Sequence, residues 1–150
     1  MNSIKLKNKL KKGELVLGTL IVSASPFWLK ILENCSLDFI FIDTEHIALN
    51  RVDLSWMCRS YSAIGYPPLV RMPSPDPYIA TQYLDSGASG VIAPYVEKIE
   101  QVKELIGATK KRPIKGKRLE ELIKNNNIEQ KLDEYITEFN KHNLLILNIE

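Results

Sequence analysis

The sequence predicts an α/β protein in which parallel strands alternate with helices. Three observations support this prediction: five short runs rich in Val, Ile, Leu or Phe, longer amphipathic stretches between them, and helix start or stop signals at their borders. Strands separated by helices are typically parallel and joined by right-handed crossovers. The expected order is one helix, then strand and helix repeated, and finally a fifth strand.

The five apolar runs are interpreted as buried strands because each is brief and contains few polar side chains. Their residue ranges are 15–22, 39–42, 69–70, 91–93 and 144–149. Runs of this kind are typical of parallel sheets, in which both faces are covered by other parts of the protein.

The longer stretches have helical spacing and recognisable ends. Ser25 is a possible N-cap, and Pro26 suits the first helical position, where a backbone N–H would have no partner in the helix. A second stretch ends at Gly65, ahead of two prolines, which is a typical stop signal. The predicted helices cover residues 26–32, 52–64, 76–84 and 97–108.

Composition excludes several classes of protein. The chain has 150 residues, 45% hydrophobic and 25% charged, so it can bury one core and is interpreted as one domain. Its 20 basic and 18 acidic residues give a formal net charge of +2, which indicates neither a nucleic-acid partner nor a membrane surface. Cys35 and Cys58 lack a CxxC spacing and are predicted to be buried, reduced thiols rather than a disulfide or a metal pair.

The N-terminal region has the outline of an export signal, because lysines precede an apolar run. Gly13 and Glu14 separate the lysines from that run, however, and Gly18 and Thr19 interrupt it. No stretch approaches the ~18 apolar residues that a membrane helix needs. The predicted compartment is therefore the cytoplasm, and the lysines are expected on a solvated helix face.

Polar side chains follow three of the predicted strands. Asp43, Glu45 and His46 follow the second strand, Arg71 follows the third, and Glu150 follows the fifth. In a parallel barrel these positions meet on one rim, where active sites of that architecture are built. Neither a dinucleotide glycine fingerprint nor a phosphate loop is present to favour a doubly wound sheet. We therefore expect a partial TIM (β/α) barrel of about five parallel strands with outer helices.

Three segments carry a more specific resemblance. They are LDFIFIDTEH at residues 37–46, PLVRMP at residues 68–73 and LDSGASGVIAP at residues 84–94. In this order and spacing they resemble the HpcH/HpaI aldolase/citrate lyase family of metal-dependent class II pyruvate aldolases. The resemblance is strong over residues 13–111, weaker over residues 113–140, and returns in residues 145–150. It implies that residues 1–150 are the N-terminal portion of a single (β/α) barrel domain.

The resemblance also implies a reaction and roles for four residues. The reaction is carbon–carbon bond cleavage or formation through a pyruvate enolate, with a 2-oxo acid and an aldehyde as substrates. Arg71 matches the family's oxo-acid-binding arginine, since a guanidinium donates paired hydrogen bonds to such oxygens. His46 matches the proton-transferring imidazole, and Asp85 matches the carboxylate that pairs with it. Glu150 matches one of two carboxylates that hold a divalent cation, Mg²⁺ or Mn²⁺.

Each of these residues also has a simpler interpretation. Arg71 can be a solvated charge, His46 a structural histidine, and Asp85 a turn residue before Ser-Gly. Asp43 and Glu45 are interpreted as loop groups, or as groups that support the site from behind, near His46. Their joint presence, in the order of the family, favours the site.

The sequence also departs from the family pattern. The second metal carboxylate of the family lies in a segment beyond Glu150, and Leu119 replaces a glycine of the loop that contains residues 113–118. A barrel of about five strands is not closed within this chain. Two functions therefore stay open: an aldolase that is truncated and impaired as an isolated chain, or a non-catalytic half-barrel that serves as an assembly or binding module. A homo-oligomer is expected, because an open apolar face favours a partner.

Overall fold

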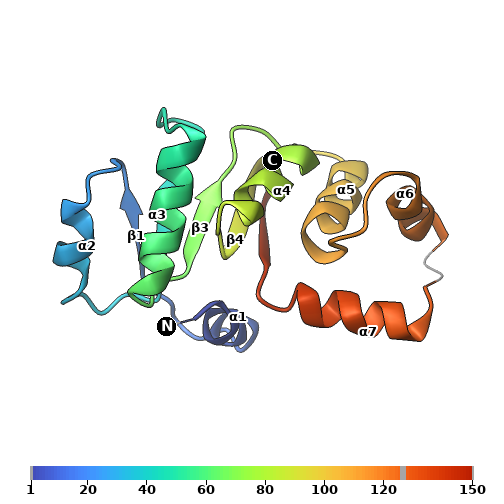
Figure 1. Cartoon of the computed structure of the whole chain (residues 1–150), viewed down its shortest axis with the longest axis horizontal. Helices are drawn as coiled ribbons and strands as arrows, with labels where there is room; N and C mark the ends of the chain where they lie inside the picture. Colours follow the sequence, from blue (N-terminus) through green and yellow to red (C-terminus); the bar gives the residue numbers. More distant parts are fainter. Residues whose placement is uncertain (1, 126–127, 150) are drawn as a thin grey trace.

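The computed structural model describes residues 2–125 and 128–149. Within them, five parallel strands form one sheet in sequence order: β1 (Gly18–Ile21), β2 (Phe39–Asp43), β3 (Pro68–Arg71), β4 (Gly90–Val96) and β5 (Leu144–Ile149). The helices are α1 (Ser3–Lys11), α2 (Phe27–Leu32), α3 (Arg51–Ala63), α4 (Pro77–Asp85), α5 (Ile99–Lys110), α6 (Gly116–Asn125) and α7 (Gln130–Phe139). The predicted α/β class, strand order and open sheet are confirmed, with β1 and β5 as the two edges (Figure 1).

Side chains alternate between the two faces of the sheet, as they must along any strand. One face is covered by helices and is formed by Ile40, Ile42, Val70, Val91 and Ala93. The opposite face, which we call the open face, is formed by Phe39, Phe41, Leu69, Ile92, Leu144 and Ile146. Asp43 lies two residues beyond Phe41, and Arg71 lies two beyond Leu69. The alternation therefore places both charged side chains at the end of the open face.

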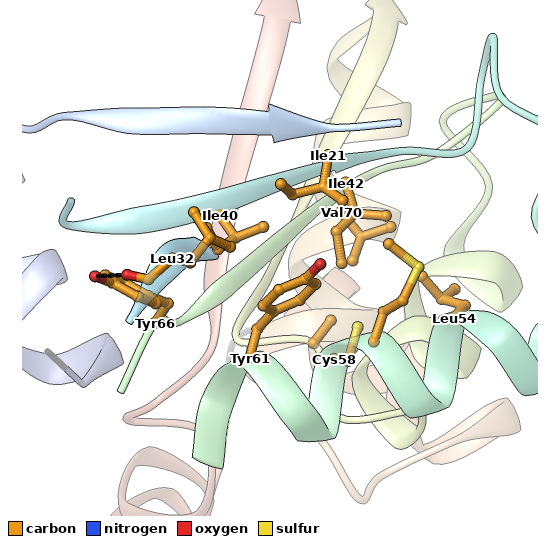
Figure 2. Packing of buried hydrophobic residues seen from close by; sticks show 11 residues of the cluster. Ile21, Leu32, Ile40, Ile42, Leu54, Cys58, Tyr61, Tyr66 and Val70 are labelled. Atoms are coloured by element: carbon orange, nitrogen blue, oxygen red, sulfur yellow. Dashed lines mark hydrogen bonds between the residues drawn. The ribbon is translucent and has the colours of Figure 1, made fainter. Parts of the chain in front are cut away.

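Helix α3 packs its apolar stripe against the covered face of the sheet. Figure 2 shows Leu54, Cys58 and Tyr61 of this helix directed toward Ile42 and Val70. The hydroxyl group of Tyr61 is buried there without a hydrogen-bond partner in the described part of the chain. Burial raises the pKa of Tyr61 to about 12. This packing supports β2 and β3 from one face, and the two strands end in Asp43 and Arg71.

Side-chain caps define where two of the helices begin. The Asn50 side chain accepts hydrogen bonds from the backbone of the first turn of α3, and Asp76 does the same for α4. Both helices lie within one residue of their predicted ranges. Helices α6 and α7 occupy the region in which the resemblance to the family is weaker.

Two local predictions are wrong. Cys35 is exposed, whereas Cys58 is buried as predicted, and both thiols are free. Lys9 of α1 does not belong to a solvated face, because its Nζ lies 2.8 Å from Asp38 Oδ1 and ties the helix to the segment before β2. In the range that the structure describes, no helix is long and apolar enough to cross a membrane.

Candidate active site

An ion pair joins the C-terminal ends of β2 and β3. The strand register places Asp43 directly beside Arg71. Arg71 donates from Nε to Asp43 Oδ1 at 3.0 Å and from Nη2 to Oδ2 at 2.6 Å. The guanidinium also lies over the Phe41 ring, 5.6 Å from its centroid, where the cation is attracted to the ring face. The bidentate pair and the ring together fix the plane of the guanidinium.

Glu45 is a second carboxylate at the same guanidinium. Its Oε2 lies 3.1 Å from Arg71 Nε, yet this buried oxygen accepts no hydrogen bond within the described residues, since the Nε–H is directed at Asp43. Its Oε1 accepts a hydrogen bond from the Tyr95 hydroxyl. The backbone N–H of Glu45 donates to Asp43 Oδ1 at 3.0 Å, so Asp43 orients both the arginine and the loop that carries Glu45.

The ion pair between Asp43 and Arg71 stabilises the charged form of both side chains. The hydrogen bond from Arg71 holds the pKa of Asp43 below its usual value, against the opposing effect of burial. The same bond raises the pKa of Arg71. The side chains of Asp43 and Glu45 are 5% and 8% exposed, so water screens them little. The formal charges of Asp43, Glu45 and Arg71 sum to one net negative charge.

His46 borders the cluster on its solvent side. Its side chain is 65% exposed, and its Nε2 lies 3.7 Å from Glu45 Oε1. His46 and Arg71 therefore both lie next to the Glu45 carboxylate, and Arg71 also pairs with Asp43. From sequence, Asp43 and Glu45 are interpreted as loop or supporting groups near His46, and in the structure both contact Arg71.

Asp85 lies elsewhere. It is the last residue of α4, its side chain is 59% exposed, and its carboxylate pairs with Arg112. Helix α4 returns from the end of β3 to the start of β4, so its last residue lies near the N-terminal ends of the strands. The expected pair of Asp85 with His46 does not form within the chain. Glu150, the predicted metal ligand, falls outside the described residues.

Known proteins match the chain over most of its length. The sequence profile of the family described as HpcH/HpaI aldolase/citrate lyase matches residues 17–150. The chain belongs to this family. A 2-dehydro-3,6-dideoxy-6-sulfogluconate aldolase of Pseudomonas putida is 31% identical over 105 residues, which are 70% of this chain and 41% of that aldolase. A 2-keto-3-deoxy-L-rhamnonate aldolase of Klebsiella pneumoniae is 25% identical over 144 residues, which are 96% of this chain and 54% of that aldolase.

Solved structures of HpcH/HpaI proteins have the same fold. The HpcH/HpaI aldolase from Desulfitobacterium hafniense DCB-2 superposes with a TM-score of 0.74 at 26% identity, over 97% of this chain and 56% of its own. The citrate synthase SbnG superposes with a TM-score of 0.72 at 27% identity, over 95% of this chain and 54% of its own. The chain thus spans about half the length of these relatives, and its open sheet corresponds to part of their barrel.

Resemblance to the HpcH/HpaI family implies a divalent cation at this site. In residues 2–125 and 128–149, no group of three His, Cys, Asp or Glu side chains is placed to hold a metal ion. Asp43 and Glu45 are already directed at Arg71 and Tyr95. The described residues alone therefore do not fit a metal centre.

Sequence reasoning missed three residues that build this candidate site. Thr44 Oγ1 donates to the Arg71 carbonyl at 2.6 Å and lies 2.7 Å from the Tyr83 hydroxyl, so β2, β3 and α4 are joined behind the arginine. Tyr95 holds Glu45 from the end of β4. Thr44 lies within the segment that carried the resemblance, whereas no sequence pattern marks either tyrosine.

Proposed function

We propose that the chain supplies the N-terminal portion of an HpcH/HpaI aldolase barrel and the part of its active site that binds a small 2-oxo acid. The reaction is carbon–carbon bond cleavage or formation through a pyruvate enolate, with an aldehyde as the second substrate. The observation that carries this proposal is the guanidinium of Arg71, fixed by Asp43 at the C-terminal end of the sheet, with His46 3.7 Å from the neighbouring Glu45 carboxylate. The related aldolases named above support the same reaction class.

Arg71 is suited to bind the oxo acid. Its bonds to Asp43 use the Nε–H and one N–H of Nη2, which leaves the other three guanidinium N–H groups for substrate oxygens. A planar guanidinium donates parallel hydrogen bonds to a carboxylate or to an enolate oxygen. Because Asp43 already fixes the plane, the arginine needs no reorientation when negative charge develops on the substrate.

His46 is suited to transfer the proton. An imidazole can donate and accept a proton through its ring nitrogens, and the exposed position of His46 leaves it open to substrate or to a bridging water. Glu45 is the carboxylate that the fold places beside it. We therefore assign to Glu45, rather than to Asp85, the orientation of His46 within one chain.

A divalent cation, Mg²⁺ or Mn²⁺, remains part of the proposal, with Glu150 as its predicted ligand. The reason is electrostatic, because one net negative charge at Asp43, Glu45 and Arg71 disfavours an anionic oxo acid until positive charge is added. The cytoplasmic location and the barrel domain over residues 1–150 also remain predictions.

The proposal is tested by metal-dependent oxaloacetate decarboxylation. We expect little turnover from the purified chain and measurable turnover when the C-terminal half of a family aldolase, expressed separately, is added. Arg71→Lys should reduce that turnover, because an ammonium group cannot reproduce the bidentate pair with Asp43. Absence of turnover with every metal and C-terminal half tested, while both parts are folded and associated, would contradict the proposal.

A second candidate, a non-catalytic assembly module, is favoured by one observation. Strand β1 lies at a sheet edge, and its Leu20 side chain is 48% exposed. An edge of this kind pairs readily with another chain, which agrees with the predicted homo-oligomer. Sedimentation should show self-association that a Leu20→Lys substitution weakens. A monomer at high concentration would contradict this candidate.

A further inference from the structure

Tyr95 has an unusual backbone. In the part of the chain that the structure describes, it is the one residue other than glycine with a positive φ, of 53°. It lies where the pairing of β4 with β5 changes register, between Ala93 and Val96. Non-glycine residues avoid this conformation, and those that adopt it at a bulge commonly have a side chain redirected toward a functional site.

The redirected side chain reaches the candidate active site. The Tyr95 hydroxyl donates to Glu45 Oε1, so the end of β4 contacts the loop that follows β2. The other oxygen of this carboxylate lies 3.1 Å from Arg71 Nε and accepts no hydrogen bond within the described residues. The hydrogen bond from the Tyr95 hydroxyl to Oε1 is therefore the one that fixes the rotation of the Glu45 carboxylate. His46 Nε2 lies 3.7 Å from the same Oε1.

We propose that Tyr95 is a positioning residue, whose hydroxyl holds the Glu45 carboxylate between Arg71 and His46. Its consequence for turnover rests on the function proposed above, whereas the contact itself does not. Without the hydroxyl, the carboxylate is free to rotate toward His46. Asp43 still fixes Arg71 in that case, so substrate binding should change little while proton transfer loses its geometry.

The contact is tested by carbon NMR of the full chain, labelled at the glutamate carboxyl carbons and held at neutral pH. Glu45→Gln identifies the Glu45 resonance by its loss. We expect Tyr95→Phe to move that resonance and to leave the other glutamates in place, while Tyr78→Phe, a change at an exposed tyrosine of α4, moves none. Tyr95→Gly should move it as well, and glycine accepts the positive φ, so this variant decides the question if the phenylalanine variant does not fold. An unmoved Glu45 resonance would overturn the proposal.

Turnover supplies the second test, using the chain combined with a C-terminal half. We expect Tyr95→Phe to lower kcat about tenfold with KM changed less than about twofold, and to have no effect in a Glu45→Gln background. An equal loss in both backgrounds would overturn the positioning role, because the effect would not pass through Glu45. If wild-type combinations that are folded and associated have no turnover with any metal or C-terminal half tested, the proposed aldolase function fails, and the NMR experiment still decides the contact.

Discussion

Asp43→Asn is the substitution that most directly perturbs the organisation of this site. The new side chain has the same shape, but its amide group replaces one of two oxygens that accept hydrogen bonds from Arg71 at 3.0 and 2.6 Å. Removal of one partner of a buried ion pair lowers the free energy of unfolding by ~3 to 5 kcal/mol. Loss of a single charge-assisted hydrogen bond lowers it by less. Because Arg71 is 23% exposed and keeps Glu45 nearby, we expect a loss of about 2 kcal/mol in the free energy of unfolding at neutral pH.

The pH dependence of this loss follows from the depressed pKa of Asp43. A carboxyl group whose pKa is lower in the folded chain stabilises the fold above its usual value of 3.8, and this stability is lost as the pH falls through the folded pKa. The difference between wild type and Asp43→Asn should therefore narrow below pH 3.8. Urea unfolding followed by tryptophan fluorescence measures the loss in unfolding free energy at neutral pH and its decrease in acid. Asp133→Asn, which breaks a surface pair with Lys111 at 3.5 Å, should cost less than about 0.5 kcal/mol. A similarly small cost for Asp43→Asn, or a gap that stays constant into acid, would refute the reasoning.

Three further substitutions probe the packing of the sheet and its helices, each measured by urea unfolding. Gly90→Ala should lower the free energy of unfolding by about 2 kcal/mol, because the added Cβ would lie 2.5 Å from Leu144 Cβ where β4 meets β5. Wild-type stability in this variant would show that β4 and β5 move apart to accommodate the methyl group without cost. Tyr61→Phe should stabilise by about 1 kcal/mol, because it removes a buried hydroxyl without a hydrogen-bond partner in the described residues; destabilisation would indicate a bound water or another partner. Lys110 has a pKa lowered to about 8 by burial, so the unfolded chain holds a proton that the folded chain has lost between pH 8 and 10.5. Wild-type stability should therefore rise relative to Lys110→Met by about 1 kcal/mol across that interval, after allowance for solvent screening, and parallel pH profiles would contradict this.

The fold could be predicted from sequence because apolar periodicity dominates it. The predicted range of the last strand, residues 144–149, coincides with β5, and the polar residues after the second and third strands did mark one end of the sheet. The same periodicity predicts the face on which Asp43 lies. Side chains alternate along β2, so Asp43 follows Phe39 and Phe41 onto the face that Arg71 occupies. The strand pattern thus indicates Asp43 as a neighbour of Arg71, whereas the sequence interpretation places it only near His46, as a loop or supporting group.

The positions of the Asp85 and Tyr95 side chains could not be predicted from the local sequence. Asp85 belongs to a segment that resembles the family, but the direction of α4 carries it away from His46 and toward Arg112. Tyr95 reaches Glu45 because a bulge and a positive φ redirect one side chain, and a tyrosine after proline carries no pattern that indicates either feature. Pairing between segments far apart in the chain decided both placements.

Exchange of the methyl protons of pyruvate with solvent deuterium tests most directly whether Arg71 is the oxo-acid-binding group. The chain combined with the C-terminal half of a family aldolase and Mg²⁺ or Mn²⁺ is compared with its Arg71→Ala and Arg51→Ala variants by proton NMR. Arg51 is an exposed arginine at the start of α3 and serves as the matched control. We expect Arg71→Ala to slow exchange by about a hundredfold or more, since the enolate loses its fixed guanidinium, and Arg51→Ala to stay near the wild-type rate. Equal exchange rates in Arg71→Ala and wild type would contradict the assignment of this site.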